Sequence, residues 1–252
     1  MLNNAIVHGM SILEAFGPKS FMLSLAEIAR KTGLPKASVY RILKTFTELN
    51  YLKYDDKSKK YYLGPKVLSL GFTALQSMDV HEIARPFLKK LSDECNKTVN
   101  LAVLDNHEVV YIDRIRVHDI RDFTISIGTR MPVYNTAVGK AITASLNEPE
   151  LTALIAQIKS DPAFLRLFGN ETRLRKVLDE IRQSGFATGE EEFLKGIIAV
   201  AAPLRSQNGV HSAINIVAPS SVASIGELKE QYVPKLIETS EQISELLAGT
   251  PS

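Results

Sequence analysis

Basic and polar side chains that could bind an anion recur along one predicted helix near the start of the chain. Over residues 36–49, apolar residues at helical spacing define one face of that helix. An arginine can make two hydrogen bonds to one guanine, and a serine hydroxyl can reach a base or a phosphate. By itself, the polar face could equally be the solvated side of an ordinary helix. It consists of Lys36, Ser38, Tyr40, Arg41 and Lys44.

A second feature with binding chemistry is a helix start built of small residues. Residues 128–141 lead from a strand into a helix that begins near Thr136. Small side chains leave the N–H groups of Ala137 and Val138 open to an anion, which the helix dipole also favours. Tight packing of a helix on a sheet selects the same small residues, so the sequence supports both interpretations equally.

The acidic run Glu190-Glu191-Glu192 is a third candidate, between Gly189 and an apolar strand predicted over residues 197–204. Three adjacent glutamates usually form a solvated run. Because apolar segments flank this run, one glutamate could turn inward, and the sequence does not say which.

The chain lacks the residue patterns of catalysis and metal binding. It has no Walker loop, GxGxxG, HExxH or GxSxG motif, and its five histidines are scattered. His211 and Ser212 are adjacent on a predicted strand, so their side chains face opposite sides and cannot act as base and nucleophile. Cys95, the only cysteine, suits a small core position. We therefore expect no enzyme, no metal and no cofactor.

The length and the charge distribution of the chain limit the classes of protein to which it can belong. A chain of 252 residues favours two domains, and the longest notable apolar run, residues 197–204, is too short for a membrane helix. The N-terminus lacks the pattern of a secretory signal, which predicts a cytoplasmic protein with no membrane partner. Residues 1–80 hold 11 Lys and Arg against 6 Asp and Glu, whereas the remainder holds 19 against 22. The basic N-terminal part predicts an anionic partner.

Three helices are predicted to position the basic face. The first spans residues 5–16, and Ser24 with Glu27 predicts a capping box at the start of the second. Gly33 ends the second helix in a tight turn, and Pro35 suits the first turn of the third.

The spacing of small and apolar residues indicates a helix-turn-helix. Ala29, four residues before Gly33, allows the third helix to approach closely, and Val39 with Ile42 would pack against the second helix. The polar face of the third helix would then project into the DNA major groove. This spacing favours DNA binding over a plain helical hairpin.

A hairpin and a further helix extend this unit. Tyrosine-rich strands are predicted at residues 51–54 and 61–63, joined by a polar turn that carries Lys57, Lys59 and Lys60. A hairpin directly after a recognition helix is the wing of a winged helix, whose lysines would contact phosphate. Residues 65–79 predict a linker helix that packs on a second copy as well as on its own domain, so that two recognition helices meet a palindromic site.

The rest of the chain predicts an α+β domain with an antiparallel sheet. The Asn208-Gly209 turn between apolar runs is a strong hairpin signal. Strands in hairpins with helices between them exclude a parallel doubly wound sheet. The expected strands are residues 98–104, 108–112, 123–127, 197–204 and 210–218. The expected helices are residues 80–95, 136–146, 148–158, 173–183 and 224–247, the last broken at Pro234.

Together these residues resemble the IclR family of bacterial transcription regulators over nearly the whole chain. The specific part is Thr136-Ala137-x-Gly139-Lys140-Ala141 followed by Val200-Ala201-Ala202-Pro203. The resemblance also rests on residues 11–16, the helix-turn-helix at 23–43, Tyr51-Leu52 with Tyr62-Leu63-Gly64, and Gly185 with Glu191.

The resemblance implies a winged helix-turn-helix DNA-binding domain at residues 1–64, a linker helix at 65–79 and a GAF-like effector-binding domain at 80–250. Family members dimerise, often as dimers of dimers, on palindromic promoter DNA. Many repress catabolic operons in response to small organic, aromatic or sugar acids. We therefore expect a homodimer or tetramer that binds double-stranded promoter DNA and a small carboxylate effector.

Site residues follow from the same positions. Because some relatives carry an acid at the position of Gly189 and a cysteine at that of Ala199, Asn215 is expected to be the main side-chain hydrogen-bonding group, with the helix start taking a carboxylate. The residues expected to contact DNA are Ser24, Lys36, Ala37, Ser38, Tyr40, Arg41, Lys44, Lys57, Lys59 and Lys60. The implied effector pocket comprises Thr136, Ala137, Val138, Gly189, Glu190, Glu191, Ala199, Asn215 and Val217.

Two other functions are weighed against a ligand-responsive regulator. An enzyme that uses the winged helix to dock a protein would need a nucleophile–base pair, and the sequence shows none. An orphan DNA-binding regulator with a non-functional pocket would be favoured by bulky residues at Ala137 and Ala199, and both are small.

Overall fold

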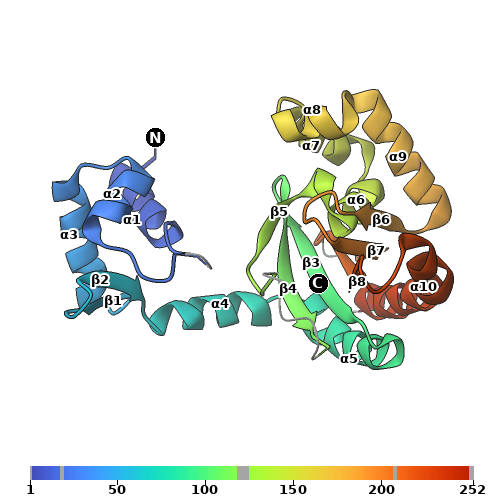
Figure 1. Ribbon diagram of the computed structural model, residues 1–252, viewed down its shortest axis with the longest axis horizontal. Helices are drawn as coiled ribbons and strands as arrows, with labels where there is room; N and C mark the ends of the chain where they lie inside the picture. Colours follow the sequence, from blue (N-terminus) through green and yellow to red (C-terminus); the bar gives the residue numbers. More distant parts are fainter. Residues whose placement is uncertain (1, 18–19, 118–124, 207–208, 250–252) are drawn as a thin grey trace. The chain divides into compact units, whose positions relative to one another are not determined.

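The computed structural model describes residues 2–17, 20–117, 125–206 and 209–249 (Figure 1). The chain divides into two compact units, Met1–Ser77 and Met78–Ser252, each with its own core. The predicted linker helix is α4 (Lys66–Gln76), and it belongs to the first unit. Among the described residues, no helix is both long and apolar enough to cross a membrane.

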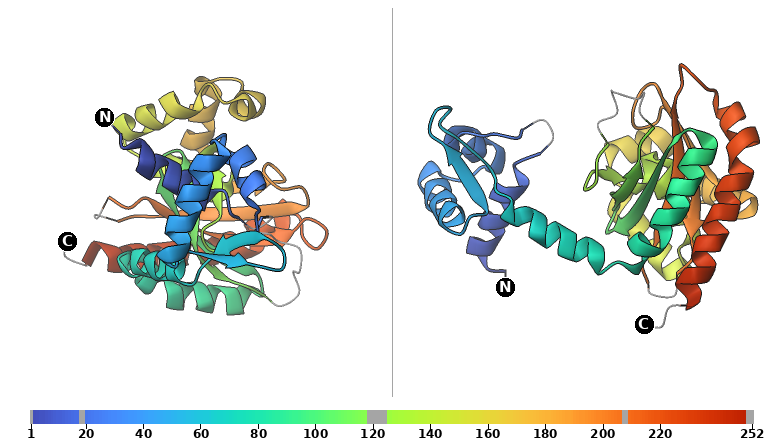
Figure 2. Two further views of the ribbon diagram at one scale, coloured as in Figure 1. Left: turned by 90° about the vertical axis from the view of Figure 1, so that its left-hand side faces the viewer. Right: turned by 90° about the horizontal axis from the view of Figure 1, so that it is seen from below.

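The first unit confirms the predicted winged helix-turn-helix. It contains α1 (Asn4–Glu14), α2 (Leu25–Thr32), α3 (Lys36–Glu48), β1 (Leu52–Asp55) and β2 (Lys60–Leu63), and α4 leads out of β2 (Figure 2). Its core contains one or two fully buried residues from each of α1, α2, α3 and β1. These positions are Ile12, Ile28, Val39, Leu43 and Leu52.

Local capping fixes the two helices of the motif as the sequence predicts. Ser24 Oγ accepts from the Glu27 N–H at 3.3 Å, and Glu27 Oε2 accepts from the Ser24 N–H at 2.8 Å. Gly33 takes a left-handed φ of 70°, which a residue with a Cβ adopts only with strain. Pro35 lies one residue earlier than predicted, because it caps α3 from outside with ψ at 136°.

The wing is anchored to the helices by its backbone. β1 and β2 pair antiparallel, and Leu23, just before α2, exchanges two backbone hydrogen bonds with Tyr61. Gly64 ends the wing where a Cβ would lie 2.5 Å from the Asn50 carbonyl oxygen, so only glycine fits there. Lys66 then lies 4.6 Å from the centre of the Tyr51 ring, which ties the start of α4 to the wing.

The second unit is built on a six-stranded antiparallel sheet, which confirms the predicted α+β class. The strand order is β5-β4-β3-β8-β7-β6. The strands are β3 (Thr98–Asp105), β4 (Glu108–Ile115), β5 (Arg130–Pro132), β6 (Ala187–Glu190), β7 (Ile197–Leu204) and β8 (Ser212–Pro219).

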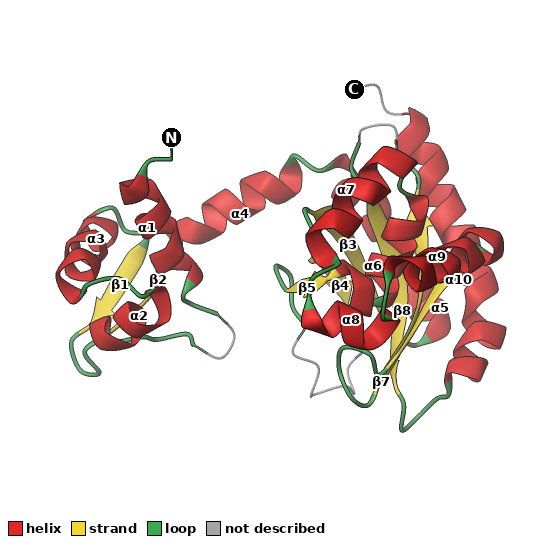
Figure 3. Ribbon diagram, turned by 90° about the horizontal axis from the view of Figure 1, so that it is seen from above, coloured by secondary structure: helices red, strands yellow, loops and turns green. Residues whose placement is uncertain are grey.

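Helices cover both faces of this sheet. On one face, α5 (Asp79–Cys95) and α10 (Ile225–Gly249) run side by side (Figure 2), with the free Cys95 buried as expected. On the other face, α6 (Ala137–Ser145) packs on β7, β8 and β6, preceded by the 3-10 turn η1 (Val133–Asn135) (Figure 3). Beyond α6 lie α7 (Glu148–Ile158), α8 (Pro162–Phe168) and α9 (Glu171–Ser184).

Two predictions for this unit are wrong. Residues 125–127 form no strand, because Gly128 at φ 86° and the Ser126–Thr129 hydrogen bond turn the chain before β5 begins; residues 123–124 lie outside the described residues. The last helix is not broken at Pro234. A proline removes one backbone donor, and the flanking Val233 and Leu236 stay buried in the core.

Candidate DNA-binding surface and effector cavity

Helix α3 is held by its apolar face and presents its basic face. Val39 and Leu43 are fully buried, whereas Tyr40 is 55% exposed and Arg41 is exposed beside it. The Arg41 guanidinium makes no hydrogen bond or ion pair with any residue that the structure describes. Lys36, Ala37 and Lys44 are also exposed, and Ser38 is half-buried.

The wing turn is organised by Asp55 rather than by its lysines. Asp55 Oδ2 accepts from the Ser58 hydroxyl and from the Ser58 N–H at 2.8 Å, and these bonds lower the pKa of Asp55. Lys57 is exposed. Lys59 and Lys60 have weak internal partners, since their Nζ atoms lie 3.7 Å from Asp56 and 3.8 Å from Glu27. Such surface pairs exchange readily with a phosphate.

Ser24, predicted to contact DNA, is already engaged within the protein. Its hydroxyl donates to Glu27 Oε2 at 2.8 Å in the capping box. The hydrogen bonds from the Ser24 N–H and hydroxyl lower the pKa of Glu27. The main role of Ser24 is therefore to cap the start of α2. A contact of its hydroxyl with DNA would be additional to this role.

Two helices of the first unit leave apolar side chains in solvent. On α1, Ile6 is 63% exposed and Met10 is 49% exposed. On α4, Leu68, Leu70 and Phe72 are each about 60% exposed, and no residue of α4 is buried. Apolar patches of this kind mark protein contacts more often than free surface.

In the second unit, a small cavity of about 50 Å³ lies between the sheet and the start of α6. Seven of the nine predicted effector residues line it, whereas Val138 and Glu190 do not. Its lining also includes residues that the sequence did not single out. The lining residues are Tyr111, Ile125, Met131, Asn135, Thr136, Ala137, Gly189, Glu191, Glu192, Phe193, Leu194, Ile197, Ala199, Asn215 and Val217.

The small residues around the α6 start have two different roles. Some allow close packing of the helix, and others leave its first N–H groups uncovered. A Cβ on Gly139 would lie 2.1 Å from the Val133 carbonyl oxygen, so Gly139 lets α6 pack on η1. Thr136 caps the helix by accepting from the Gly139 N–H at 3.0 Å. Gly189 lies opposite the first turn, where a Cβ would stand 3.4 Å from the Ala137 nitrogen. Any larger residue at 189 would cover that N–H.

The loop after β6 lines one side of the cavity, and Glu192 is the glutamate that turns inward. Lys140 Nζ lies 2.6 Å from both Glu192 carboxylate oxygens, and the Lys140 side chain is only 6% exposed. Glu191 adopts a left-handed φ of 54° and its carboxylate accepts from the Ser220 hydroxyl at 2.7 Å. That hydrogen bond is the main reason why the pKa of Glu191 is lowered. Glu192 was missed because nothing in an acidic run distinguishes its members.

Asn215 occupies the floor of the cavity as expected, with a partner that the sequence analysis missed. Asn215 Oδ1 accepts from Asn100 Nδ2 at 2.8 Å, and both side chains are buried. Tyr111 also lines the cavity, and burial raises its pKa well above the usual range. A single asparagine inside a strand of mostly apolar residues is the signal that could have found Asn100.

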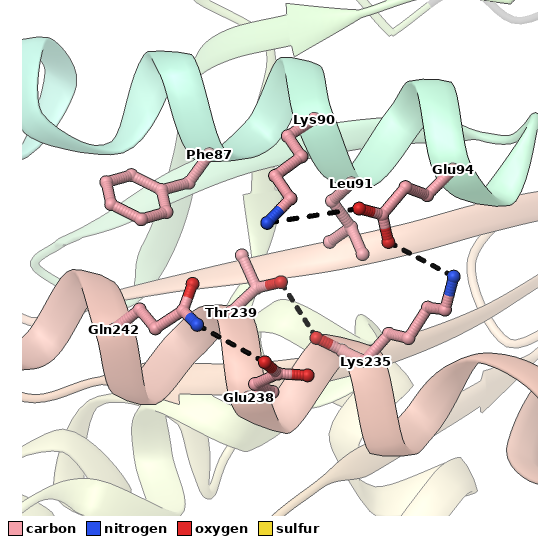
Figure 4. A pocket seen from close by; sticks show the side chains of 8 residues that line it. All are labelled: Phe87, Lys90, Leu91, Glu94, Lys235, Glu238, Thr239 and Gln242. Carbon is pink, nitrogen blue, oxygen red and sulfur yellow. Dashed lines mark hydrogen bonds and ion pairs between the residues drawn. The ribbon is translucent and has the colours of Figure 1, made fainter.

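A larger groove of about 240 Å³ lies between α5 and α10, but its polar groups are partnered (Figure 4). Glu94 bridges Lys90 at 4.0 Å and Lys235 at 3.1 Å across the two helices. None of the predicted site residues lies there. Among the described residues, no group of three or more His, Cys, Asp or Glu side chains could hold a metal ion.

These features define a class of protein: a winged helix-turn-helix unit joined to a small-molecule-binding unit, as in ligand-responsive transcription regulators. Residues 72–245 match the family model described as bacterial transcriptional regulator IclR C-terminal, and residues 5–56 match the IclR helix-turn-helix domain. The chain therefore belongs to the IclR family of transcription regulators.

Named relatives agree with this assignment. The chain is 27% identical to the Pca regulon regulatory protein of Pseudomonas putida, over 97% of this chain and 84% of that protein. It is 26% identical to the transcriptional repressor IclR of Escherichia coli K12, over 86% and 80%.

Solved structures show the same architecture. An IclR family transcriptional regulator from Brucella abortus has a TM-score of 0.81 and 28% identity, covering 100% of this chain and 94% of that one. An IclR homologue from Microbacterium hydrocarbonoxydans, complexed with 4-hydroxybenzoate, shares the fold with a TM-score of 0.77 and 21% identity, covering 96% and 98%.

Proposed function

We propose that this regulator reads DNA with α3 and holds phosphates with the wing. The observation that carries the proposal is the division of α3, on which buried Val39 and Leu43 fix the helix while Arg41 stays exposed and without a partner in the described chain. Arg41 and Ser38 would contact base edges, and the wing lysines would contact the backbone. The proposed DNA contacts are Lys36, Ala37, Ser38, Tyr40, Arg41, Lys44, Lys57, Lys59 and Lys60, with Ser24 positioning α2.

The protein acts as a homodimer or a dimer of dimers on a palindromic site. The exposed apolar residues of α1 and α4 support this assembly, because burying Leu68, Leu70 and Phe72 against a second copy removes apolar surface from water. The DNA-binding units of the two chains would then present two copies of α3 to half-sites about one helical turn of DNA apart.

The cavity of the second unit takes a small carboxylate effector. The α6 N-terminus supports this choice, because its first N–H groups have no carbonyl partner within the helix and Gly189 leaves them uncovered. A volume of about 50 Å³ holds only a few waters, so the loop at 191–194, which lines the cavity, moves outward when an organic acid binds. That opening gives the ligand two states to discriminate.

Ligand binding changes DNA affinity by favouring one arrangement of the paired first units. A coupling of about 1–3 kcal/mol between the two sites changes DNA affinity about 5–150-fold. We propose that the regulated genes form a catabolic operon, that regulation is mostly repression, and that the protein works in the cytoplasm without catalysing a reaction. Relatives that are named as regulators, including a repressor, support this.

Footprinting of the upstream region of the protein's own gene tests the DNA-binding part. We expect protection of two half-sites related by a dyad, about 10 base pairs apart, which disappears in Arg41→Ala at the same salt concentration. Uniform, salt-sensitive coating of all DNA by both proteins would contradict sequence-specific binding by α3.

A further inference from the structure

A row of polar side chains crosses the sheet on the face that carries the cavity. Arg114 on β4 pairs in register with Asn100 on β3, and Asn100 pairs with Asn215 on β8. Directly paired residues of antiparallel strands point to the same side of a sheet, with the strands about 4.8 Å apart. Thr98 lies on the same face, two residues before Asn100. These four residues interrupt an otherwise apolar surface beneath α6.

Three atoms of this row are buried and have no hydrogen-bond partner. They are the Thr98 hydroxyl, Asn100 Oδ1 and Arg114 Nε. Leaving a buried polar atom unsatisfied costs about 1–3 kcal/mol, so unsatisfied atoms at neighbouring positions of one sheet face indicate a polar partner there, either water or a ligand. Thr98 and Asn100 are both at most 2% exposed.

Arg114 also has no counter-charge in the part of the chain that the structure describes. Its Nη1 donates to the Ile125 carbonyl oxygen at 2.6 Å, and no described carboxylate contacts the guanidinium, since Asp113 accepts only from the Arg114 backbone N–H. Burial is the main cause that lowers the pKa of Arg114, and the neighbouring cation Arg116 adds to the effect. A half-buried guanidinium in such surroundings favours an anion.

The row adjoins the cavity through two residues that line it, although Thr98, Asn100 and Arg114 are not themselves lining residues. Asn215 lines the cavity and bonds Asn100, and Ile125 lines the cavity and accepts from Arg114. If the amides of Asn100 and Asn215 are both rotated by a half-turn, their mutual bond is kept and Asn100 offers Nδ2 in place of Oδ1. Thr98, Asn100 and Arg114 then present three donors, the complement of a carboxylate, which only accepts.

We propose that Arg114, with Thr98 and Asn100, forms the subsite that binds the acid group of the effector. This proposal rests on the proposed carboxylate effector and names the side chain that selects for its charge. The α6 N-terminus adds a partial positive charge to the same cavity. A neutral amide of equal shape would place a donor against these donors and bind more weakly.

Calorimetric titration of the full chain with matched acid and amide pairs tests the subsite. The probes are 4-hydroxybenzoate, pyruvate and gluconate with their neutral amides, covering aromatic, organic and sugar acids. We expect at least one acid to bind the wild-type protein. Arg114→Met should weaken that acid about tenfold or more and leave its amide nearly unchanged. Arg114→Lys should retain part of the preference for the acid.

Stability and a matched arginine control distinguish a binding role from a structural one. Because Arg114→Met removes a half-buried cation that has no counter-charge among the described residues, we expect the Tm of the ligand-free protein to be equal or higher. Arg173→Gln removes the same charge from an exposed arginine on α9 and should leave acid affinity nearly unchanged. Thr98→Val, which keeps the charge and size, should weaken the acid about fivefold, and this variant decides the matter if Arg114→Met does not fold.

The outcomes separate this proposal from the function on which it rests. If an acid binds the wild-type protein and both Arg114→Met and Thr98→Val equally well, a buried water alone occupies the subsite and the proposal is overturned. If none of the three acids binds the wild-type protein, the carboxylate effector is overturned, and this subsite falls with it.

Discussion

Lys140 and Glu192 join the first turns of helix α6 to the loop that lines the cavity of the second unit. Lys140 Nζ lies 2.6 Å from each Glu192 oxygen, and the Lys140 side chain is 6% exposed against 22% for Glu192. The lysine is therefore the deeper partner of the pair. Removing either charge should release the loop, but the two substitutions leave different groups behind.

We expect Glu192→Gln to destabilise the protein more than Lys140→Met does. Glu192→Gln leaves a buried ammonium without its counter-charge, at a cost of about 3 kcal/mol, whereas Lys140→Met leaves a carboxylate that can reach water. Urea unfolding of the two variants at the same pH measures both free energies. The opposite order of stability would show that the pair does not anchor the loop.

Arg41 and Lys59 should have different effects on DNA binding. Arg41→Ala should weaken binding to the natural site by about 1–3 kcal/mol and relax sequence preference, because a base contact is lost. Lys59→Ala should weaken binding to all sequences alike and reduce the slope of affinity against salt, because a phosphate contact is lost. Titrations of each variant on the natural site and on random DNA at several salt concentrations measure this. Equal losses on both DNAs for Arg41→Ala would contradict its role in reading bases.

Phe72 should contribute to the dimer. It is 61% exposed on α4, a helix with no buried residue, so Phe72→Glu should leave the fold of one chain intact. A glutamate placed in an apolar contact between two copies should dissociate the dimer at micromolar concentration. Light scattering after size-exclusion chromatography gives the mass, and Ser69→Glu on the same helix is the control for added charge. A dimer of unchanged mass in Phe72→Glu would place the contact elsewhere.

Gly139 should tolerate no side chain, whereas Gly226 should tolerate one. A Cβ on Gly139 would stand 2.1 Å from the Val133 carbonyl oxygen, so Gly139→Ala must displace α6 and should cost about 3 kcal/mol or more. The Cβ of Gly226→Ala, in the first turn of α10, would meet only Ser224 Oγ at 3.7 Å, and this variant should gain up to about 1 kcal/mol. Similar unfolding midpoints for the two variants would show that the backbone of η1 can move away from α6 at little cost in stability.

The parts that local chemistry decides were predictable from the sequence. The capping box of Ser24 with Glu27 and the turn at Gly33 depend on residues within a few positions of each other, so the helix-turn-helix could be predicted almost to the residue. The antiparallel pairing of β7 with β8 follows in the same way from two apolar runs close in sequence, whereas Asn208 of the predicted turn lies outside the described residues.

The remaining features depend on contacts between distant residues, which periodicity does not contain. Glu192 turns inward only because Lys140, 52 residues earlier, lies beneath it. The pairing of Asn100 with Asn215 follows from the register of two strands 115 residues apart. Pro234 breaks no helix because tertiary packing of its neighbours outweighs its local penalty.

The central claim is that a small acid bound in the second unit changes the DNA affinity of the first. Fluorescence anisotropy of the protein on labelled upstream DNA, at one fixed salt concentration with and without 4-hydroxybenzoate, pyruvate or gluconate, tests it most directly. We expect at least one acid to shift the dissociation constant by about fivefold or more, and Arg114→Met to abolish that shift while binding DNA normally in its absence. Tight, sequence-specific DNA binding that none of these acids changes would contradict the claim and favour an orphan regulator with a non-functional cavity.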